Sequence, residues 1–476
     1  MSLPTRRSLL YATGSLLAGT ALAGCLSGQQ SKNHDTEENS QQTDNNTQQN
    51  PAGMNILQSD SNAIDTAVDS STRNRLVRGN TAFALTLHKK LAEADNRTNF
   101  LLSPHSISVA LAMTYAGSNA KTRSQIRETL QFRVNDDRLH HSFATLSGAV
   151  DPPASTATPA QTPTTETTSN DGDGTPFTLE TVNSVWGQRG FPWRDTYLDT
   201  LAKFYGAGLN VVDFENDYEA ARTQINEWVS EQTAGKIQEL FPRGSLHQYT
   251  RLVLTNAVYF HANWEHAFAN DRTENKPFTA LDDQTSTVPM MVQSANELPY
   301  AEENGVQAVE LPYVGDAVGM VILLPEAGQF RSFEQKLDAD RLQSIFDSLT
   351  PTGGTLSLPK FSFETSVGLT ETLSSLGMAN AFDRSNADFT GMYQSETSDG
   401  NLFIDDIKHK THIAVDESGT EAAAATGVSI GTTSAPVDPY EMTVDRPFLF
   451  CIRHQPTNAI LFVGRVGDAG DIAPDK

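Results

Sequence analysis

DESGTEAAAATGVSIGTTSAP, residues 416–436, consists almost entirely of Ala, Gly, Ser and Thr and lies between two segments that have the pattern of buried strands. It has neither the spaced apolar residues of an amphipathic helix nor the alternation of a half-buried strand. Residues 151–176 are similarly polar but rich in proline, whereas residues 417–435 contain none. Because proline would block a central strand, its absence distinguishes residues 417–435 from a proline-rich linker such as residues 151–176.

The composition narrows the kinds of partner. The chain has 476 residues, 38% of them hydrophobic, with a formal net charge of −24 at pH 7 and a pI near 4.8. Nucleic acid and anionic lipid both require a basic face, so neither is expected as a partner. The acidic excess is typical of adaptation to a salt-rich habitat (a halophile-like composition), or of an ordinary acidic secreted protein.

Two cysteines are too few for a framework of disulfide bonds. Cys451 lies in the apolar run RPFLFCIRH and is predicted to be a buried, unreactive thiol.

The N-terminus is predicted to be an export signal and not part of the fold. Arg6 and Arg7 precede an apolar run, residues 9–22, that is too short for a comfortable membrane span, and LAGC follows it. Twin arginines at this place resemble a Tat signal, and LAGC resembles a lipobox in which Cys25 is lipidated. The alternative is a plain signal peptide, residues 1–24, with a chance cysteine. We expect an exported protein, lipid-anchored at the cell surface or extracellular.

The remaining chain divides by composition. Residues 25–74 are predicted to be a disordered polar tether with a reach on the order of 40 Å. Residues 75–468 form the folded domain, interrupted by a disordered Thr/Pro-rich insertion at 151–176, and 469–476 are a C-terminal tail. Helical patterns come first and strand-like runs dominate the C-terminal half, so we predict an α+β fold and not alternating βαβ units.

The sequence gives little support for an enzyme. It contains no G-x-S-x-G, H-E-x-x-H, C-x-x-C, P-loop or G-x-G-x-x-G motif. Residues 118–121, SNAK, match the S-x-x-K pattern of β-lactamases, but the partner motifs S-D-N and K-T-G are missing. The eleven histidines are not spaced as metal ligands. We therefore expect no catalytic residue, no metal and no cofactor.

Three separated segments together resemble the serpins, a family of suicide protease inhibitors. They are residues 99–126 (NFLLSPHSISVALAMTYAGSNAKTRSQI), 254–268 (LTNAVYFHANWEHAF) and 415–430 (VDESGTEAAAATGVSI), the last followed by MTVDRPFLFCIRHQPTNAILFVGRV at 442–466. Their order and spacing fit the family over residues 75–468. The resemblance implies three β-sheets, eight or nine helices, and an exposed reactive-centre loop near the C-terminus, at 417–440.

In inhibitory serpins this loop is bait for a protease, and after cleavage its N-terminal part inserts into the largest sheet as a new strand. The residues suit that use, because alternate side chains of a strand face the buried side. If Thr420 faces inward, so do Ala422, Ala424 and Thr426, which are all small, whereas Glu421 faces outward. We expect Gly419 to give backbone freedom at the turning point.

The resemblance carries over further residues. Trp264 matches the large aromatic residue where insertion begins, and Ser103, Ser106, Asn256 and His409 match the polar cluster beneath the opening point of the main sheet. Read without the resemblance, these four would be an ordinary satisfied hydrogen-bond network. The hinge is matched by Glu417, Gly419, Thr420, Glu421, Ala422, Ala423, Ala424 and Ala425.

Family spacing from Glu417 puts the cleaved bond at Thr433–Ser434, a register that could move by one or two residues. The implied function is suicide inhibition of a secreted serine protease through a covalent acyl-enzyme complex, by a monomeric inhibitor. Residues 418–445 contain no Arg or Lys, which favours an elastase-like or subtilisin-like target with a pocket for small or uncharged side chains. Cysteine proteases stay open as targets. The alternatives are a non-inhibitory carrier, storage or chaperone-like protein with this fold, and an enzyme of the cell envelope.

Overall fold

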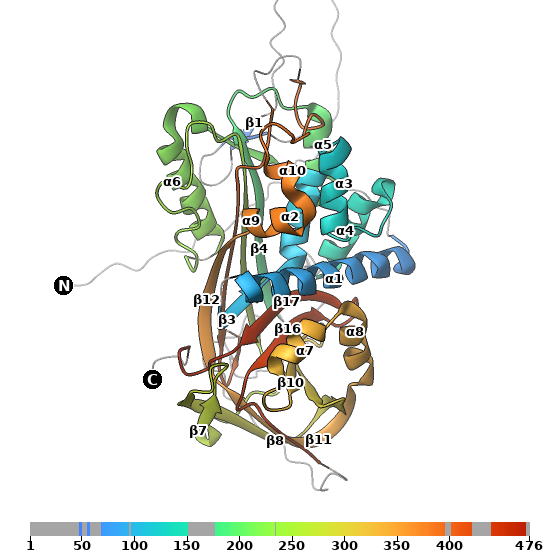
Figure 1. Cartoon of the computed structure of the whole chain (residues 1–476), viewed down its shortest axis with the longest axis vertical. Coiled ribbons are helices and arrows are strands. Elements are labelled where there is room, and N and C mark those ends of the chain that lie inside the picture. Colours follow the sequence, from blue (N-terminus) through green and yellow to red (C-terminus); the bar gives the residue numbers. More distant parts are fainter. Residues whose placement is uncertain are drawn as a thin grey trace, which may run out of the picture. The chain divides into compact units, whose positions relative to one another are not determined.

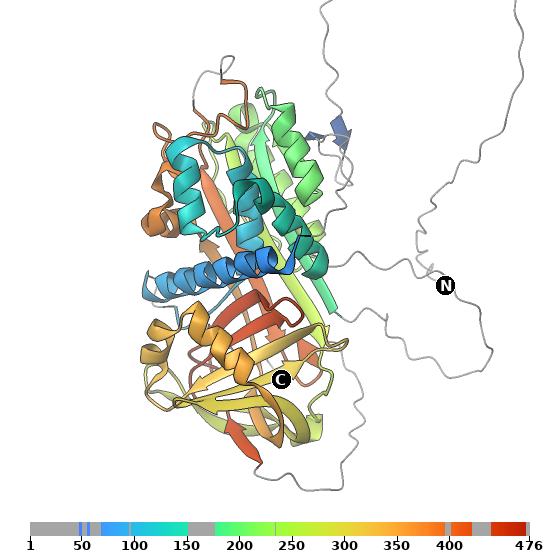
Figure 2. The ribbon, with the colours of Figure 1, turned by 90° about the vertical axis from the view of Figure 1, so that its right-hand side faces the viewer.

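A computed structural model describes residues 47–49, 55–57, 68–94, 97–150, 177–233, 235–395, 401–420 and 439–472 (Figures 1 and 2). The predicted lipidation site, the insertion at 151–176 and most of the reactive-centre loop lie outside these residues. Among the residues described, no helix is both long enough and apolar enough to cross a bilayer.

The first sheet contains eight of the described strands, in the order β1-β2-β5-β4-β6-β14-β13-β12. Burial alternates strictly along β13, which shows that one face of this strand is fully covered. The strands are β1 (Thr47–Gln49), β2 (Asn55–Leu57), β5 (Leu209–Val212), β4 (Phe177–Gln188), β6 (Leu252–Asn263), β14 (Gly419–Thr420), β13 (Asp406–Val415) and β12 (Phe361–Gly368).

Nine described strands form a second hydrogen-bonded network, in the order β15-β11-β8-β9-β10-β16-β17-β3 with β7 paired to β8. The long strand β8 pairs with β7 and β11 and then, from Tyr300 onward, with β9. The three sheets that we predicted are thus one separate sheet and two that share β8. The strands are β15 (Tyr440–Thr443), β11 (Thr350–Pro359), β8 (Thr285–Glu303), β9 (Val306–Pro312), β10 (Val318–Pro325), β16 (Phe448–His454), β17 (Ala459–Val466), β3 (Asn99–Leu102) and β7 (Glu274–Thr279).

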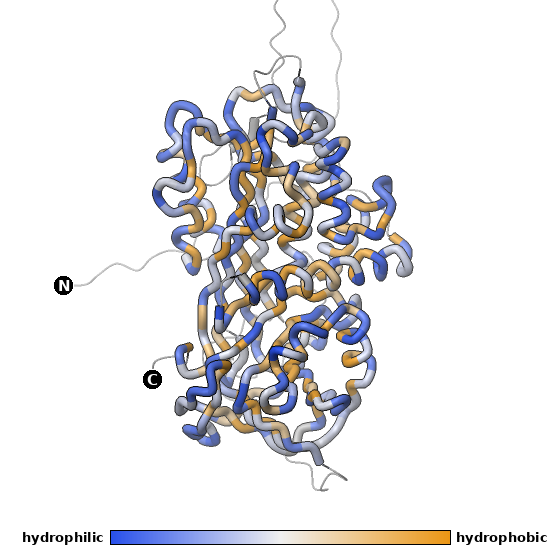
Figure 3. The backbone as a smooth tube through the Cα atoms, in the orientation of Figure 1, coloured by the Kyte–Doolittle hydropathy of each residue, from blue (hydrophilic) through white to orange (hydrophobic). Residues whose placement is uncertain are grey.

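Helices cover both faces of the first sheet. On its inner face lies α2, which begins at Pro104, a residue favoured in the first turn of a helix, and is buried almost all round. On the outer face α6 packs against β4 and β6, in a second core that includes Trp186 and Ala257 (Figures 1 and 3). The helices are α1 (Ser70–Ala94), α2 (Pro104–Ala116), α3 (Ala120–Thr129), α4 (Asp136–Val150), α5 (Asp195–Tyr205), α6 (Phe214–Gln232), α7 (Phe330–Lys336), α8 (Ala339–Ser348), α9 (Thr370–Leu373) and α10 (Ala379–Phe382).

A π-helical turn at Ser374–Met378 joins α9 and α10 into one irregular helix, which makes nine helices among the described residues. The predicted α+β class, with eight or nine helices, is therefore confirmed.

The N-terminal boundary differs from the prediction. The helix α1 begins at Ser70 and not at residue 75, and within the expected tether β2 pairs with β5 through Ile56 and Leu57. The prediction of disorder was wrong for these residues, because pairing at a sheet edge uses backbone groups that every non-proline residue supplies.

Cys451 agrees with its prediction. It is a free, buried cysteine, and desolvation raises the pKa of its thiol to about 12. The thiol therefore stays protonated and unreactive at neutral pH.

Candidate functional site: the hinge and the opening of the first sheet

The first two residues of the predicted inserting strand already lie in the sheet. β14 is antiparallel to β6, with Gly419 opposite Asn263 and Thr420 opposite Ala262, and on its other side Thr420 pairs with Val415 of β13. Away from this end β6 and β13 pair directly as parallel strands, from Val253–Asp406 to Tyr259–His412. The sheet is thus closed along most of its length and parted at one end, where the loop enters.

Gly419 is required for close approach. A Cβ atom at this position would lie 2.1 Å from the carbonyl oxygen of Ala262 in β6, a distance that no side chain tolerates. Gly419 is not among the described glycines with positive φ. In this state, therefore, the missing side chain of Gly419, and not a left-handed backbone conformation, is what lets β14 lie against β6.

Thr420 points into the protein beneath two aromatic rings. It is fully buried, and its hydroxyl lies 2.7 Å from the Tyr313 hydroxyl. The Tyr313 ring stacks on Trp264, with ring centroids 4.5 Å apart at an angle of 12°. Trp264 also holds the chain before the hinge, since its indole Nε1 donates to the Asp416 carbonyl at 3.0 Å. Sequence reasoning missed Tyr313, which lies in a connection between strands with no distinguishing pattern.

Glu417 is fixed by an ion pair. Its carboxylate accepts from Lys360 Nζ at 2.8 Å and from Thr273 Oγ1 at 2.7 Å. Burial alone would raise the pKa of the Glu417 carboxyl, but these two donors outweigh burial and hold the pKa below its ordinary value. The ionised Glu417 carboxylate therefore ties the hinge to Lys360, between β11 and β12, and to Thr273, in the turn before β7. Neither Lys360 nor Thr273 was predicted.

The four predicted residues of the polar cluster do lie together, and a fifth joins them. Asn183 of β4, Asn256 of β6 and His409 of β13 lie opposite one another on three neighbouring strands. Asn256 Nδ2 donates to Asn183 Oδ1 and, at 2.7 Å, to the hydroxyl of Ser106, while its Oδ1 contacts His409 Nδ1. Asn183 could have been noticed as a lone amide on the inward parity of an apolar strand.

The imidazole of His409 is held in one tautomer. Its Nε2 accepts from the Ser103 backbone N–H at 3.2 Å, so Nδ1 carries the proton and donates to Asn256. Desolvation lowers the pKa of this ring to about 3, although the hydrogen bond with Asn256 opposes the shift. His409 is therefore neutral in the folded protein and joins β6 to β13 without a charge.

The remaining predicted site residues lie outside the described part of the chain. They are Cys25, the hinge residues Glu421, Ala422, Ala423, Ala424 and Ala425, and the reactive bond Thr433–Ser434. Within the described residues, no three or more His, Cys, Asp or Glu side chains gather as a metal site.

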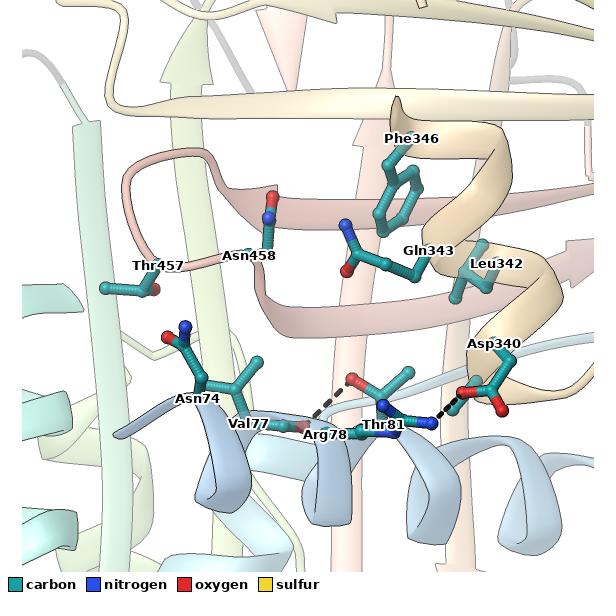
Figure 4. Close-up of a pocket in the computed structure, with 11 residues that line it drawn as sticks. Asn74, Val77, Arg78, Thr81, Asp340, Leu342, Gln343, Phe346, Thr457 and Asn458 are labelled. Carbon is teal, nitrogen blue, oxygen red and sulfur yellow. Dashed lines mark hydrogen bonds and ion pairs between the residues drawn. The ribbon is translucent and has the colours of Figure 1, made fainter. Parts of the chain in front are cut away.

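A cavity of about 240 Å³ lies away from the hinge, between α1, α8 and the turn after β16 (Figure 4). The ion pair of Arg78 and Asp340 crosses it, with both side chains exposed. None of the residues lining this cavity belongs to the hinge or the polar cluster.

Comparison with known proteins agrees with this geometry. The family described as "Serpin (serine protease inhibitor)" matches residues 78–469. An uncharacterized serpin-like protein of Thermococcus kodakarensis is 39% identical over 393 residues, covering 82% of this chain and 85% of that protein. The leukocyte elastase inhibitor of Xenopus laevis is 35% identical, covering 81% and 97%.

A solved structure is also similar. The crystal structure of a thermophilic serpin, tengpin, in the native state matches with a TM-score of 0.73 and 27% identity, covering 86% of this chain and 97% of that one. The chain thus combines two findings. Its first sheet is parted at one end, with a hinge of small residues at the opening, and its family match extends over most of its length. The chain belongs to the serpin family.

Thr420→Arg should stop loop insertion without stopping cleavage. A guanidinium cannot replace the buried hydroxyl beside Tyr313, because an unpaired buried charge costs far more than an exposed one. The expected result is full cleavage of the loop by a target protease with loss of covalent complex on a denaturing gel. Thr420→Ser keeps the hydroxyl and should retain complex formation. Undiminished trapping by the arginine variant would contradict the inward orientation of Thr420.

The native state should weaken in acid, partly through His409. The unfolded chain binds a proton on this histidine below its ordinary pKa of about 6.5, whereas the folded state takes it up only near pH 3. Stability is therefore present above pH 6.5 and is lost as the pH falls toward 3, by about 1.4 kcal/mol per pH unit for one such group. In His409→Asn the midpoint of thermal unfolding should fall less steeply between pH 6 and pH 4.

The matched control is His266→Asn, which replaces an exposed histidine in the same way. Equal steepness in wild type and His409→Asn would show that another group carries the pH dependence.

Proposed function

We propose that the protein is a suicide inhibitor of secreted serine proteases, acting through insertion of its reactive-centre loop into the first sheet. The observation that carries this proposal is the register of β14, which begins an antiparallel strand between β6 and β13. Cleavage of the loop would free the residues after Thr420 to extend that strand.

The register predicts the inserted state residue by residue. If Thr420 stays opposite Ala262, then Ala422 comes opposite Phe260, Ala424 opposite Val258 and Thr426 opposite Asn256. All of these pairs lie on the inner face, where small side chains avoid the cost of overpacking, about 1–3 kcal/mol per site.

Insertion must separate the direct pairs between β6 and β13, and hence Asn256 from His409. Thr426 would arrive at that level, where its hydroxyl can both donate and accept. The polar cluster would therefore exchange one partner for another, while the backbone gains an antiparallel ladder on each side of the new strand. A strand added in this way makes the inserted form lower in free energy than the native form, which is then a kinetic trap.

The chemistry comes from the target. The protease serine attacks the carbonyl of Thr433, the bond to Ser434 breaks, and the protease remains attached through an ester. Insertion before water hydrolyses this ester carries the protease to the far end of the sheet and distorts its active site. Small residues surround the bond and residues 418–445 lack Arg and Lys, which favours an elastase-like or subtilisin-like target. A relative named leukocyte elastase inhibitor supports this choice.

The second candidate is a non-inhibitory carrier or binding protein of the same fold. A hinge that never inserts could hold bulky, charged or proline residues, whereas TEAAAATG at 420–427 has one charge, on the outward parity. This hinge composition favours inhibition.

Incubation with pancreatic elastase or subtilisin tests the proposal. We expect an adduct of the summed masses that survives boiling in detergent, and cleavage within residues 431–436. Loop-cleaved protein should melt well above intact protein, since each added backbone hydrogen bond contributes roughly 0.5–1.5 kcal/mol. Clean cleavage with no adduct and an unchanged melting temperature would favour the non-inhibitory candidate.

Thr433→Arg should create inhibition of trypsin, because the specificity pocket of trypsin binds a cation. The measurement is the second-order rate of trypsin inactivation, which should rise at least tenfold over wild type. Arginine at Thr432 or Ser434 is the matched comparison. Inhibition gained at only one of those positions would move the register by one residue and leave the mechanism intact.

We further propose that the mature protein is anchored through lipidated Cys25 after Tat export. Support comes from the twin arginines and LAGC of the N-terminus, and from the site where β2 joins the sheet. β2 pairs with β5 beside the start of β6, whereas β14 pairs with the end of β6. Eight residues of strand, about 26 Å, separate Leu254 from Ala262. A chain that enters the domain through β2 would thus reach the first sheet at the end of β6 opposite the hinge residues Gly419 and Thr420.

Cys25→Ser should move the protein from the membrane fraction into the medium and leave protease trapping unchanged. Fractionation of the native host followed by immunoblotting measures this. A wild-type protein wholly in the medium without lipid would contradict the anchor, and normal export of Arg6→Lys/Arg7→Lys would contradict the Tat route.

A further inference from the structure

Three large hydrophobic side chains are exposed within the described ranges, and Tyr249 is the most exposed of them. It is 57% exposed, compared with 40% for Val314 and 38% for Tyr218. Single exposed hydrophobic residues are common on protein surfaces, so exposure alone assigns no role. Two further features distinguish Tyr249, namely the turn that holds it and its position relative to β14.

The turn at 247–250 presents Tyr249 on a fixed backbone. The Thr250 hydroxyl donates to Asp405 Oδ2 at 2.6 Å and accepts from the His247 backbone N–H at 3.2 Å. The Tyr249 backbone N–H donates to His247 Nδ1 at 3.2 Å, and Thr250 is fully buried. Because these contacts already hold the backbone, the ring would lose little conformational entropy on packing against a partner.

The register of β14 leads to this turn. Thr420 lies opposite Ala262, and in an antiparallel pair each later residue of one strand comes opposite an earlier residue of the other. Continued through the inserted loop, this register brings Thr433 level with Tyr249, three residues before β6 begins. Thr433 is the residue that the proposed mechanism leaves joined to the protease serine. The protease would therefore come to lie beside the exposed ring.

We propose that Tyr249 is part of the surface against which the trapped protease packs after insertion. This inference rests on the proposed inhibitory function and names a contact at the far end of the sheet. The partner surface is the apolar rim of the protease substrate cleft, which in an elastase-like or subtilisin-like enzyme accepts small or uncharged side chains. A tyrosine ring buries a large apolar area against such a surface.

The contact would slow the release of active protease. Release is hydrolysis of the ester: water attacks the Thr433 carbonyl carbon, the bond to the protease serine oxygen breaks, and that oxygen regains a proton from the protease histidine. This step needs the displaced catalytic groups of the protease to return to their places. A ring packed against the protease beside the ester opposes that return and excludes water, so Tyr249 is a positioning residue.

Purified covalent complexes with pancreatic elastase provide the test, and the measurement is the first-order rate at which elastase activity returns. Tyr249→Ala should raise this rate at least about fivefold, because it removes an interface contact. Tyr249→Phe keeps the ring and is the matched control, with a rate within about twofold of wild type. Val314→Ala removes an exposed side chain at the hinge end, where the Val314 N–H donates to the Asn263 carbonyl, and should leave the rate unchanged.

A purely structural role for Tyr249 would show elsewhere. Substitution of such an exposed residue should leave the melting temperature of the intact protein unchanged. The rate of elastase inactivation should also be unchanged, because the first encounter takes place at the reactive-centre loop. A faster return of activity accompanied by a lower melting temperature of the intact protein would overturn the contact.

A second measurement locates the contact directly. Tyr249→Cys should react with a maleimide in the intact and the loop-cleaved protein and be protected in the complex, with the label mapped to residue 249 by mass spectrometry. Val314→Cys should react equally in all three. Equal labelling of Tyr249→Cys in complex and loop-cleaved protein, or equal return rates for Tyr249→Ala and wild type, would overturn the contact. Failure of wild type to form any adduct would contradict the proposed function, and this inference with it.

Discussion

The boundary between β6 and β13 is the constraint on which the rest of this structure depends. It is closed by parallel pairing from Val253–Asp406 to Tyr259–His412 and by the contact of Asn256 with His409. These interactions are neutral hydrogen bonds, and each contributes about 0.5–1.5 kcal/mol net to the free energy of unfolding. All of these donors and acceptors are paired when the boundary is closed. A strand inserted between β6 and β13 could replace each hydrogen bond that its entry breaks.

The parts that need not move are joined differently. Arg453 pairs with Glu310 at 2.6 Å and Arg465 with Glu334 at 3.0 Å, and all four side chains are buried or nearly so. Removing one partner of a buried ion pair typically costs about 3–5 kcal/mol, because the other charge is left unpaired. Breaking either pair would therefore destabilise the second network or α7, whereas the inner face of the boundary between β6 and β13 is joined by the neutral contact of Asn256 with His409.

Three contacts hold the hinge, and in the proposed insertion they would set the register of the strand that follows. Glu417 is tied to Lys360, the missing side chain of Gly419 lets the chain lie against β6, and Thr420 is held by Tyr313. Because the side-chain period of a strand is two residues, an error of one position here would turn Glu421 into the protein interior. In the proposed insertion, these contacts would determine which of the small residues after Thr420 face inward.

The sequence by itself determined the α+β class, the buried thiol of Cys451 and the family, because each rests on local pattern or on the order of motifs. It also predicted, through the family resemblance alone, that Ser103, Ser106, Asn256 and His409 form one cluster. Only the tertiary structure decided the roles of Tyr313 and Lys360, and the pairing of β2 with β5. These depend on contacts between residues far apart in the chain or on backbone groups common to all residues, and neither leaves a pattern in the sequence.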